Sequence, residues 1–295
     1  MKVNPVYLFV MTSAFFWGGN FVLAGPVLAD LPPIWAATMR FMLGAALMLA
    51  IAWGRGEDLL GLARRHGGAY MLLGLVGIVG FNVLFFRAMQ STSADNGALI
   101  MATNPLLTTL LAALLLGERA TSRQLLALPV ALAGVAVVVT HGDPGRLAGL
   151  RLDEGDVLML LANLTWALFN VASRRFMPKD SPVGSTALMM TSGAGMLLLL
   201  ALASGAPVAM PGTHAAAAMA VMVVGGTVLA YLFWGMGIQR LGAGRTSLFL
   251  NLVPVFAMLI GSAMGTLPTS AQLTGGAIVL AGVTLAMLPR RQAAT

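Results

Sequence analysis

The hinge Gly117-Glu118-Arg119-Ala120-Thr121-Ser122 joins two apolar segments of a unit, from Ala94 to Val139, that occurs twice in the chain. Pro105, in the first segment of the unit, recurs 149 residues later as Pro254. A spacing of about half the chain predicts a fold made of two copies of one unit. Further matches at this spacing, or one residue less, are Trp17 with Trp166, Val22 with Val171, Leu99 with Leu248, Leu110 with Leu259, Thr121-Ser122 with Thr269-Ser270, Gln124-Leu125 with Gln272-Leu273 and Leu132-Ala133-Gly134-Val135 with Leu280-Ala281-Gly282-Val283.

The composition indicates lipid as the solvent of the fold. Hydrophobic residues make up 58% of the chain, charged residues 9%, and the mean hydropathy is +0.88. A soluble domain carries roughly 25% charged residues. The sequence therefore predicts an all-α membrane protein, because its apolar runs are continuous rather than alternating. Cysteine is absent, which excludes disulfides and cysteine-based metal or nucleophile chemistry.

Ten apolar runs have about the 20 residues that cross a bilayer core. The connections between them are short and rich in turn-forming residues, such as Gly142-Asp143-Pro144-Gly145. The first run is too long for a signal peptide's apolar region and is expected to be a retained helix. The ten predicted transmembrane helices are Tyr7–Leu28, Pro33–Trp53, Gly68–Met89, Ser93–Leu116, Gln124–Thr140, Gly155–Ala172, Val183–Ala203, His214–Ile238, Gly242–Gly265 and Ala271–Leu288.

Basic residues fall mainly on one side of the membrane. If the N-terminus is inside, 13 of the 17 Lys and Arg residues lie in or beside inside loops. Only Arg146 and Arg151 lie outside, while Arg40 and Arg87 lie within spans. The positive-inside rule therefore predicts that both termini are cytoplasmic. The net charge of +7 is explained by this topology, and no nucleic-acid partner is expected.

An odd number of spans in each copy inverts the second copy relative to the first. We expect one five-helix repeat at residues 1–141, an external linker at 142–154 and the second repeat at 155–295. Inverted repeats are a construction of secondary transporters, which place the substrate site near the midplane where the repeats meet. The pattern favours alternating access, since the two halves can exchange their packing arrangements.

Several motifs together resemble the drug/metabolite transporter superfamily, specifically its ten-helix EamA-type members. They are Trp17-Gly18-Gly19-Asn20 in the first span, Arg40-Phe41 in the second, Pro105 within the fourth, and Leu116-Gly117-Glu118-Arg119 followed by Thr121 and Gln124. The resemblance covers nearly the whole chain. The second copy departs from it, because Thr266-Leu267-Pro268 replaces the Gly-Glu-Arg hinge.

The resemblance implies a bacterial cytoplasmic-membrane protein with a central cavity lined by the first four spans of each copy. Its substrate would be a small metabolite, with amino acids or related compounds as the first expectation. A broad-specificity drug exporter and a passive metabolite channel are the alternatives. The fifth and tenth spans would stand aside. Their small residues, including Gly134 and Gly282, favour close helix packing, either in a weak homodimer or within a monomer.

Polar side chains within the spans are candidates for substrate contact, because lipid-exposed amides are costly. Their amides donate and accept hydrogen bonds, which suits zwitterionic metabolites, although helix-to-helix bonding is an equal alternative. Asn104 has a second possible role, since it could satisfy the carbonyl that Pro105 leaves free. The amides within the spans are Asn20, Asn82, Asn104, Asn163, Asn170 and Asn251.

Aromatic side chains form the second candidate group. Trp17 and Trp166 lie near mid-depth, where an interfacial belt does not explain them. We expect them on opposite walls of one midplane cavity, stacking on substrate, with core packing as the alternative. Methionines such as Met101 would add adaptable surface. The other aromatic candidates are Phe81, Phe85, Phe169, Tyr231 and Trp234.

Charged groups at depth are few. Arg40 either binds a substrate carboxylate or locks its helix to backbone carbonyls, and the second role is slightly favoured. Pro105, Pro254 and Glu118 are expected to have structural or mechanistic roles. Asp95 is the only carboxylate near a span interior, so no proton relay is expected at mid-depth. The chain has no Walker motif and no clustered metal ligands or nucleophile–base pair, so we expect neither an enzyme nor a cofactor.

Overall fold

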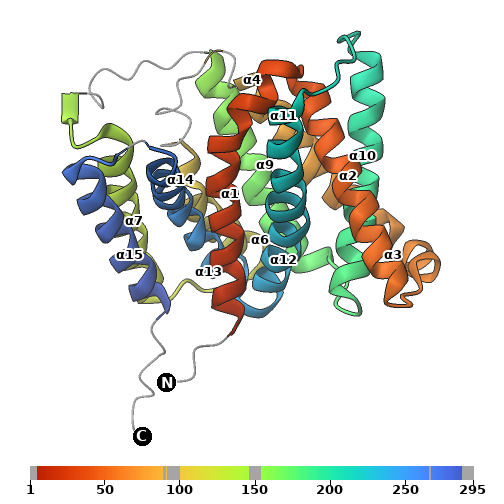
Figure 1. Ribbon diagram of the computed structural model, residues 1–295. Helices are drawn as coiled ribbons and strands as arrows, with labels where there is room; N and C mark the ends of the chain where they lie inside the picture. Colours follow the sequence, from red (N-terminus) through yellow and green to blue (C-terminus); the bar gives the residue numbers. More distant parts are fainter. Residues whose placement is uncertain (1–4, 89–90, 92–99, 146–153, 266, 288–295) are drawn as a thin grey trace, which may run out of the picture.

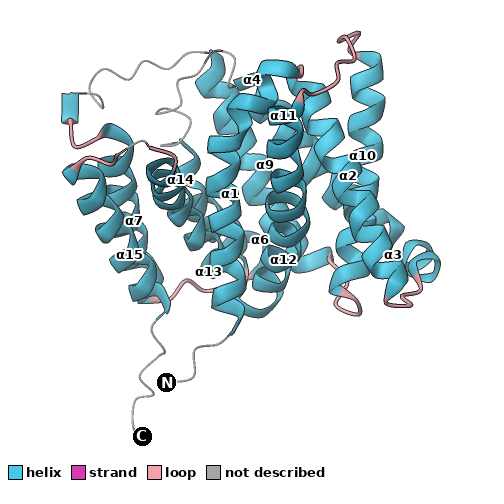
Figure 2. Cartoon of the chain, viewed as in Figure 1, coloured by secondary structure: helices cyan, strands magenta, loops and turns pink. Residues whose placement is uncertain are grey.

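The computed structural model describes residues 5–88, 91, 100–145, 154–265 and 267–287. All regular structure in these residues is helical, as Figure 2 shows. Eight helices are long and apolar enough to cross a membrane, and Ile100–Leu116 and Ser270–Ala286 are shorter apolar helices. The predicted class, an all-α membrane protein built from ten helices, is confirmed.

The first repeat contains α1 (Pro5–Asp30), α2 (Pro33–Gly54), a span made of α3 (Leu59–Gly74), the π-helical η1 (Leu75–Gly80) and α4 (Phe81–Ala88), then α6 (Asn104–Leu116) and α7 (Ser122–Thr140). The second contains α9 (Glu154–Phe176), α10 (Pro182–Ala203), a span made of α11 (Thr213–Val221), the π-helical η2 (Met222–Leu229) and α12 (Ala230–Leu241), then α13 (Ala243–Ser247), the 3-10 helix η3 (Leu248–Asn251), α14 (Leu252–Ala263) and α15 (Ser270–Met287).

One predicted boundary is wrong by more than a few residues. The third span begins at Leu59 rather than at Gly68. Hydropathy placed Arg64 and Arg65 in a loop, but both lie on α3 with exposed side chains. Asp58 caps this helix by accepting a hydrogen bond from the backbone N–H of Gly61 at 2.8 Å, which satisfies one of the free donors of the first turn.

The two repeats run in opposite directions. We call the end that holds the start of α1 and the last turn of α15 the terminal end, and the end where α1 stops at Asp30 the distal end (Figure 1). Asp30 accepts a hydrogen bond from Gly212 at the start of α11, which places that start at the distal end. The first helix of the second repeat, α9, instead runs from the distal to the terminal end, where Arg174 meets Glu118.

The inversion is visible in a pair of equivalent helix crossings. A Cβ at Gly44 of α2 would lie 2.8 Å from Thr227 of η2. A Cβ at Gly193 of α10 would lie 2.7 Å from Ile78 of η1. Gly44 and Gly193 are 149 residues apart in the sequence, and so are Ile78 and Thr227. The chain therefore makes the same close helix contact twice across a pseudo-two-fold axis, which confirms the inverted repeats.

The fifth and tenth helices pack against each other. A Cβ at Gly134 of α7 would lie 2.7 Å from the backbone nitrogen of Val279 in α15, and one at Gly282 would lie 2.9 Å from the backbone nitrogen of Ala131. The small-residue faces predicted for these helices are therefore occupied within one chain, as the monomer alternative expected. The oligomeric state itself stays a prediction.

Some predicted features lie outside the described residues. They are Asp95, the start of the fourth span at Ser93, Arg146 and Arg151 in the linker predicted at 142–154, and Leu288, the last residue of the tenth span.

Candidate functional site

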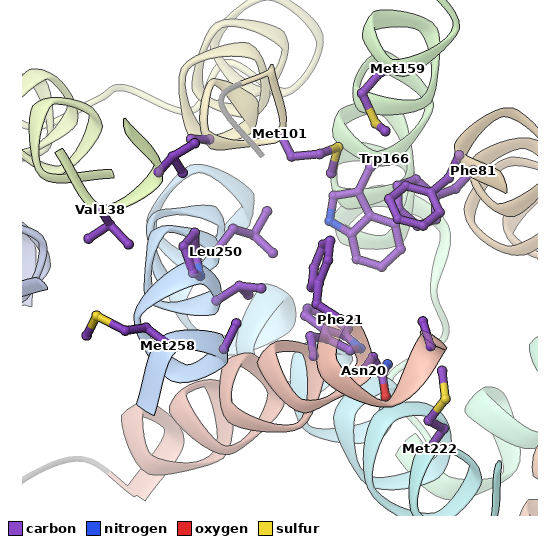
Figure 3. A pocket seen from close by; sticks show the side chains of 18 of the residues that line it. Asn20, Phe21, Phe81, Met101, Val138, Met159, Trp166, Met222, Leu250 and Met258 are labelled. Atoms are coloured by element: carbon purple, nitrogen blue, oxygen red, sulfur yellow. The ribbon is translucent and has the colours of Figure 1, made fainter. Parts of the chain in front are cut away.

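A cavity of about 370 Å³ lies where the two repeats meet. Both repeats line it, and apolar and aromatic side chains form most of its wall (Figure 3). Its volume is that of a site for one small molecule. The described residues that line it are Trp17, Asn20, Phe21, Ala24, Arg40, Phe81, Asn82, Phe85, Phe86, Met101, Ala102, Val138, Val139, His141, Met159, Trp166, Met222, Tyr231, Leu250, Val253, Pro254, Ala257, Met258 and Gln272.

The cavity occupies the distal half of the molecule. Its outer part is lined by His141 after α7 and by Gln272 in the first turn of α15, whose side chains approach to 3.4 Å. Its inner part is lined by Trp17, Trp166 and Tyr231, which lie near the middle of their spans. Most lining residues come from the distal halves of their spans, and Tyr231 and Leu250, which lie beyond the middle, are within about one helical turn of it. The cavity therefore runs from the distal end to mid-depth.

Trp17, Trp166 and Tyr231 form the aromatic floor of this cavity. The ring centroids of Trp17 and Trp166 are 5.3 Å apart with planes at 83°, and Tyr231 lies 5.9 Å from Trp17 and 5.8 Å from Trp166. Such edge-to-face pairs are favoured by the ring quadrupoles. The prediction of opposite walls is wrong, because the two tryptophans pack directly on each other. Inversion brings two mid-depth residues together at the axis rather than apart across the cavity.

Phenylalanines form one side of the cavity above this floor. Phe81 and Phe85 stack at 5.4 Å, as residues one helical turn apart on the same face of α4 can. Phe81 also contacts Trp166 at 5.0 Å, and Phe21 meets Phe85 edge-on at 6.1 Å. Apolar substrate groups that reach the floor would therefore pass along aromatic rings.

Arg40 projects from α2 into the cavity wall with only 8% of its surface exposed. Its Nη2 donates to Oδ1 of Asn82 at 3.2 Å, and Nδ2 of Asn82 donates to the carbonyl of Ile78 at 2.7 Å. The described bond of Arg40 is to a side-chain amide, and its two predicted roles, carboxylate binding and a lock on backbone carbonyls, stay predictions. No carboxylate forms an ion pair with Arg40 among the residues that the structure describes.

Three of the four predicted amides that do not line the cavity belong to a buried hydrogen-bond network between α6, α9 and α12. Trp234 Nε1 donates to Asn170 Oδ1 at 2.9 Å, and Asn170 Nδ2 donates to Asn104 Oδ1 at 3.4 Å. Asn104 Nδ2 donates to Asn163 Oδ1 at 2.7 Å. Asn104 therefore does not satisfy the carbonyl freed by Pro105, because its amide is engaged with α9. We call Asn104, Asn163, Asn170 and Trp234 the amide network.

The remaining predicted residues are placed as follows. Phe169 packs behind Trp166 at 5.1 Å, and Asn251 is buried outside the cavity lining. Pro105 and Pro254 stand in the first turns of α6 and α14, where a missing N–H is tolerated. Both follow a break in the helix, and Pro254 lines the cavity. Glu118 lies at the terminal end in an ion pair with Arg174.

Several lining residues were not predicted. Phe21 and Ala24 extend the face of α1 that carries Trp17 and Asn20, so helical spacing could have identified them. Met159, Met222 and Met258 carried no signal, because methionine is common throughout the chain. His141 and Gln272 were assigned to loop and helix-start positions. The described residues contain no group of side chains that could hold a metal ion.

Comparisons with known proteins agree with this architecture. Residues 4–140 and 153–288 each match the profile of the EamA-like transporter family. The uncharacterized transporter YyaM of Bacillus subtilis is 37% identical over 285 residues, which is 96% of this chain and 93% of YyaM. The aromatic amino acid exporter YddG of Ancylobacter novellus is 23% identical, covering 99% of this chain and 100% of YddG.

A solved crystal structure shares the fold. It superposes with a TM-score of 0.82 over 99% of both chains at 22% sequence identity. The two family matches, one in each repeat, cover nearly the whole chain. The chain therefore belongs to the EamA-like transporter family and is a multi-pass membrane transporter rather than an enzyme.

Proposed function

We propose that this protein is a secondary transporter that exports amino acids or related small metabolites across the bacterial cytoplasmic membrane by alternating access. The observation that carries the proposal is a cavity that is lined from one end of the molecule and stops at mid-depth, on the aromatic floor. A carrier site reached from one side at a time requires such an arrangement.

Contacts between the floor and the terminal end favour a transporter over a passive channel. Asn170 and Trp234 of the amide network follow Trp166 and Tyr231 on α9 and α12, so they lie on the terminal side of the floor, and both are buried. Farther toward the terminal end, Arg174 donates through Nε to Glu118 at 3.1 Å and through Nη1 to the carbonyl of Gln239. A channel would need a continuous path through these contacts. We therefore assign the structure to a state that is open toward the distal end.

Amino acids or related compounds are favoured because the cavity combines Arg40 with a wall of aromatic and methionine side chains. The full-length similarity to an aromatic amino acid exporter supports the same class. Methionines such as Met101 and Met159 can adapt to substrates of different shape. This lining would also suit a broader set of apolar compounds, which makes a multidrug exporter the second candidate.

Transport by the purified protein in liposomes tests the proposal. Labelled amino acids, their deaminated or N-acylated relatives and cationic dyes would be offered with and without a proton gradient. We expect saturable flux of at least one carboxylate compound. Flux that rises without saturation would favour a channel, and flux of the dyes alone would favour the multidrug exporter.

We expect this flux to persist without a proton gradient. Among the described residues, the cavity lining holds no aspartate or glutamate, and His141 lies at its outer part. A proton relay through the membrane core needs titratable groups at depth. Flux that stops when the gradient is removed would mean that a coupling group exists outside the described lining residues, and Asp95→Asn would be the first variant to test.

A further inference from the structure

The charge of the cavity lining is unbalanced. Arg40 is its one permanently charged side chain among the described residues, and none of those lining residues is an aspartate or glutamate. A guanidinium buried to this degree is costly unless an anion or a set of acceptors surrounds it. Within the protein, only one of its nitrogens, Nη2, has a described acceptor, the side chain of Asn82.

Two buried donors of the cavity have no hydrogen-bond partner among the described residues. They are Nε of Arg40 and Nε1 of Trp166, whose residues are only 8% and 4% exposed. The two side chains are held by consecutive residues of α4, since Arg40 bonds to Asn82 and Trp166 packs on Phe81 at 5.0 Å. Figure 3 shows the indole nitrogen of Trp166 on the side of the ring that faces the cavity.

We propose that Arg40 and Trp166 form a carboxylate-binding site, and that the substrate is a carboxylate with an apolar or aromatic body for which a free ammonium group is not required. The inference rests on the proposed transport function and specifies its substrate class. Nε of Arg40 donates to one carboxylate oxygen, in the charge-assisted manner typical of arginine. Nε1 of Trp166 is a second donor for the same ligand.

The rest of the ligand meets aromatic surface. Phe81, Phe85 and Trp17 provide ring faces and edges beside the two donors. A cavity of about 370 Å³ holds a ligand of the size of a single aromatic amino acid. A substrate ammonium group would find no carboxylate to pair with among the described lining residues. A ligand without the ammonium group therefore avoids a desolvation cost and loses no attraction to these residues.

Three matched compounds separate the contributions of the two charges. They are 3-phenylpropionate, which carries the carboxylate alone, phenylalanine, which carries both groups, and phenethylamine, which carries the amine alone. Binding to the purified protein is followed by intrinsic tryptophan fluorescence, because Trp17 and Trp166 line the cavity. We expect 3-phenylpropionate to bind at least as tightly as phenylalanine, and phenethylamine about 10-fold more weakly or worse, as the loss of a charged hydrogen bond implies.

Two variants test the role of Arg40 directly. Arg40→Gln should weaken 3-phenylpropionate binding about 10-fold or more and leave phenethylamine unaffected. Asn82→Asp keeps the arginine but gives it an internal carboxylate at the position now 3.2 Å away, and should weaken the same ligand without unfolding the protein. Arg87→Gln is the matched control, because Arg87 is an exposed arginine at the end of α4.

The outcomes distinguish this inference from the transport function. Equal binding of the amine and the carboxylate, binding of phenylalanine only, or no binding of any of the three would overturn the carboxylate site. Unchanged carboxylate binding by Asn82→Asp would do the same, even if Arg40→Gln does not fold. Transport in liposomes is a separate measurement, so flux of other compounds would leave the proposed function intact while this inference fails.

Discussion

Glu118 and Arg174 are joined by an ion pair of 3.1 Å at the terminal end, between the hinge of the first repeat and the last turn of α9. The repeat offers no equivalent pair at the distal end, because Leu267 stands where the second copy would need the acid and Gly25 where the first would need the arginine. We therefore propose that the pair favours the state that is closed at the terminal end.

Removing the negative charge of Glu118 should make the terminal end easier to open. Glu118→Gln retains the size of the side chain but loses the ion pair, which is partly exposed and therefore worth about 1 kcal/mol or less. Ile238 of α12 is fully buried, and its carbonyl accepts from Nη1 of Arg174 at 3.3 Å. The chain has no cysteine, so Ile238→Cys introduces a single buried probe beside the ion pair. We expect a maleimide to label this probe up to about fivefold faster in the Glu118→Gln background.

The control for this experiment is Glu154→Gln, which removes an exposed carboxylate from the distal end. It should leave the labelling rate of the probe unchanged. If Glu118→Gln labels at the wild-type rate, the ion pair does not contribute to closure.

The contact between α7 and α15 should not tolerate a methyl group at Gly134. A Cβ there would lie 2.7 Å from the backbone nitrogen of Val279 and 2.8 Å from the carbonyl oxygen of Gly275. Because backbone cannot rotate away, the helices must separate, at a cost of about 1–3 kcal/mol. Gly134→Ala should therefore lower the melting temperature by several degrees in detergent.

Gly195→Ala in α10 is the matched control. It also adds a methyl group to a glycine within a transmembrane helix, but a Cβ at Gly195 would meet no atom within 4 Å. It should leave the melting temperature unchanged or raise it slightly, since alanine favours the helix. A similar loss for both variants would show that helix propensity, rather than the contact, determines the effect.

Both termini are predicted to be cytoplasmic. The 13 inside and 2 outside basic residues support this orientation, and the start of α1 and the end of α15 lie at the same end of the molecule (Figure 1). A C-terminal alkaline phosphatase fusion should be inactive, whereas a fluorescent protein fusion should fluoresce. Phosphatase activity at the C-terminus would reverse the orientation and make the cavity face the cytoplasm.

The sequence was sufficient to predict the helices and their inversion. Continuous apolar runs identify spans in lipid because an unsatisfied backbone is so costly there, and the repeat spacing of 149 residues relates the two equivalent helix crossings at Gly44 and Gly193. The start of the third span was missed because Arg64 and Arg65 interrupt the apolar run. Long charged side chains can reach polar surroundings from a helix end, so they do not end the helix.

The site could be predicted only in part. Asn82 lines the cavity while Asn104 and Asn170 are satisfied in the amide network, although all three are amides within spans. What separates them is the rotation of each helix about its axis and the partners that it meets. These depend on packing between distant segments, which residue type and depth do not reveal.

Trp17, in the floor, and Trp234, on its terminal side, should respond differently to truncation. Trp234 is 1% exposed and donates to Asn170, so Trp234→Ala should destabilise the protein by about 3–5 kcal/mol. Trp17 is partly exposed and lines the cavity. Trp17→Ala should weaken substrate binding by about 0.5–2 kcal/mol and lower the melting temperature less.

Trp166 combines both roles, because it lines the cavity at 4% exposure and contacts Trp17, Phe81, Phe169 and Tyr231. Trp166→Ala should therefore reduce binding and stability together. Trp166→Phe, which retains a ring but removes the indole N–H, should separate them by weakening carboxylate binding with a smaller loss of stability. Melting curves and ligand titrations of the same preparations check all four variants. A sharply lowered melting temperature with unchanged binding for Trp17→Ala would assign Trp17 to packing, and the floor would then act as a structural barrier rather than a substrate contact.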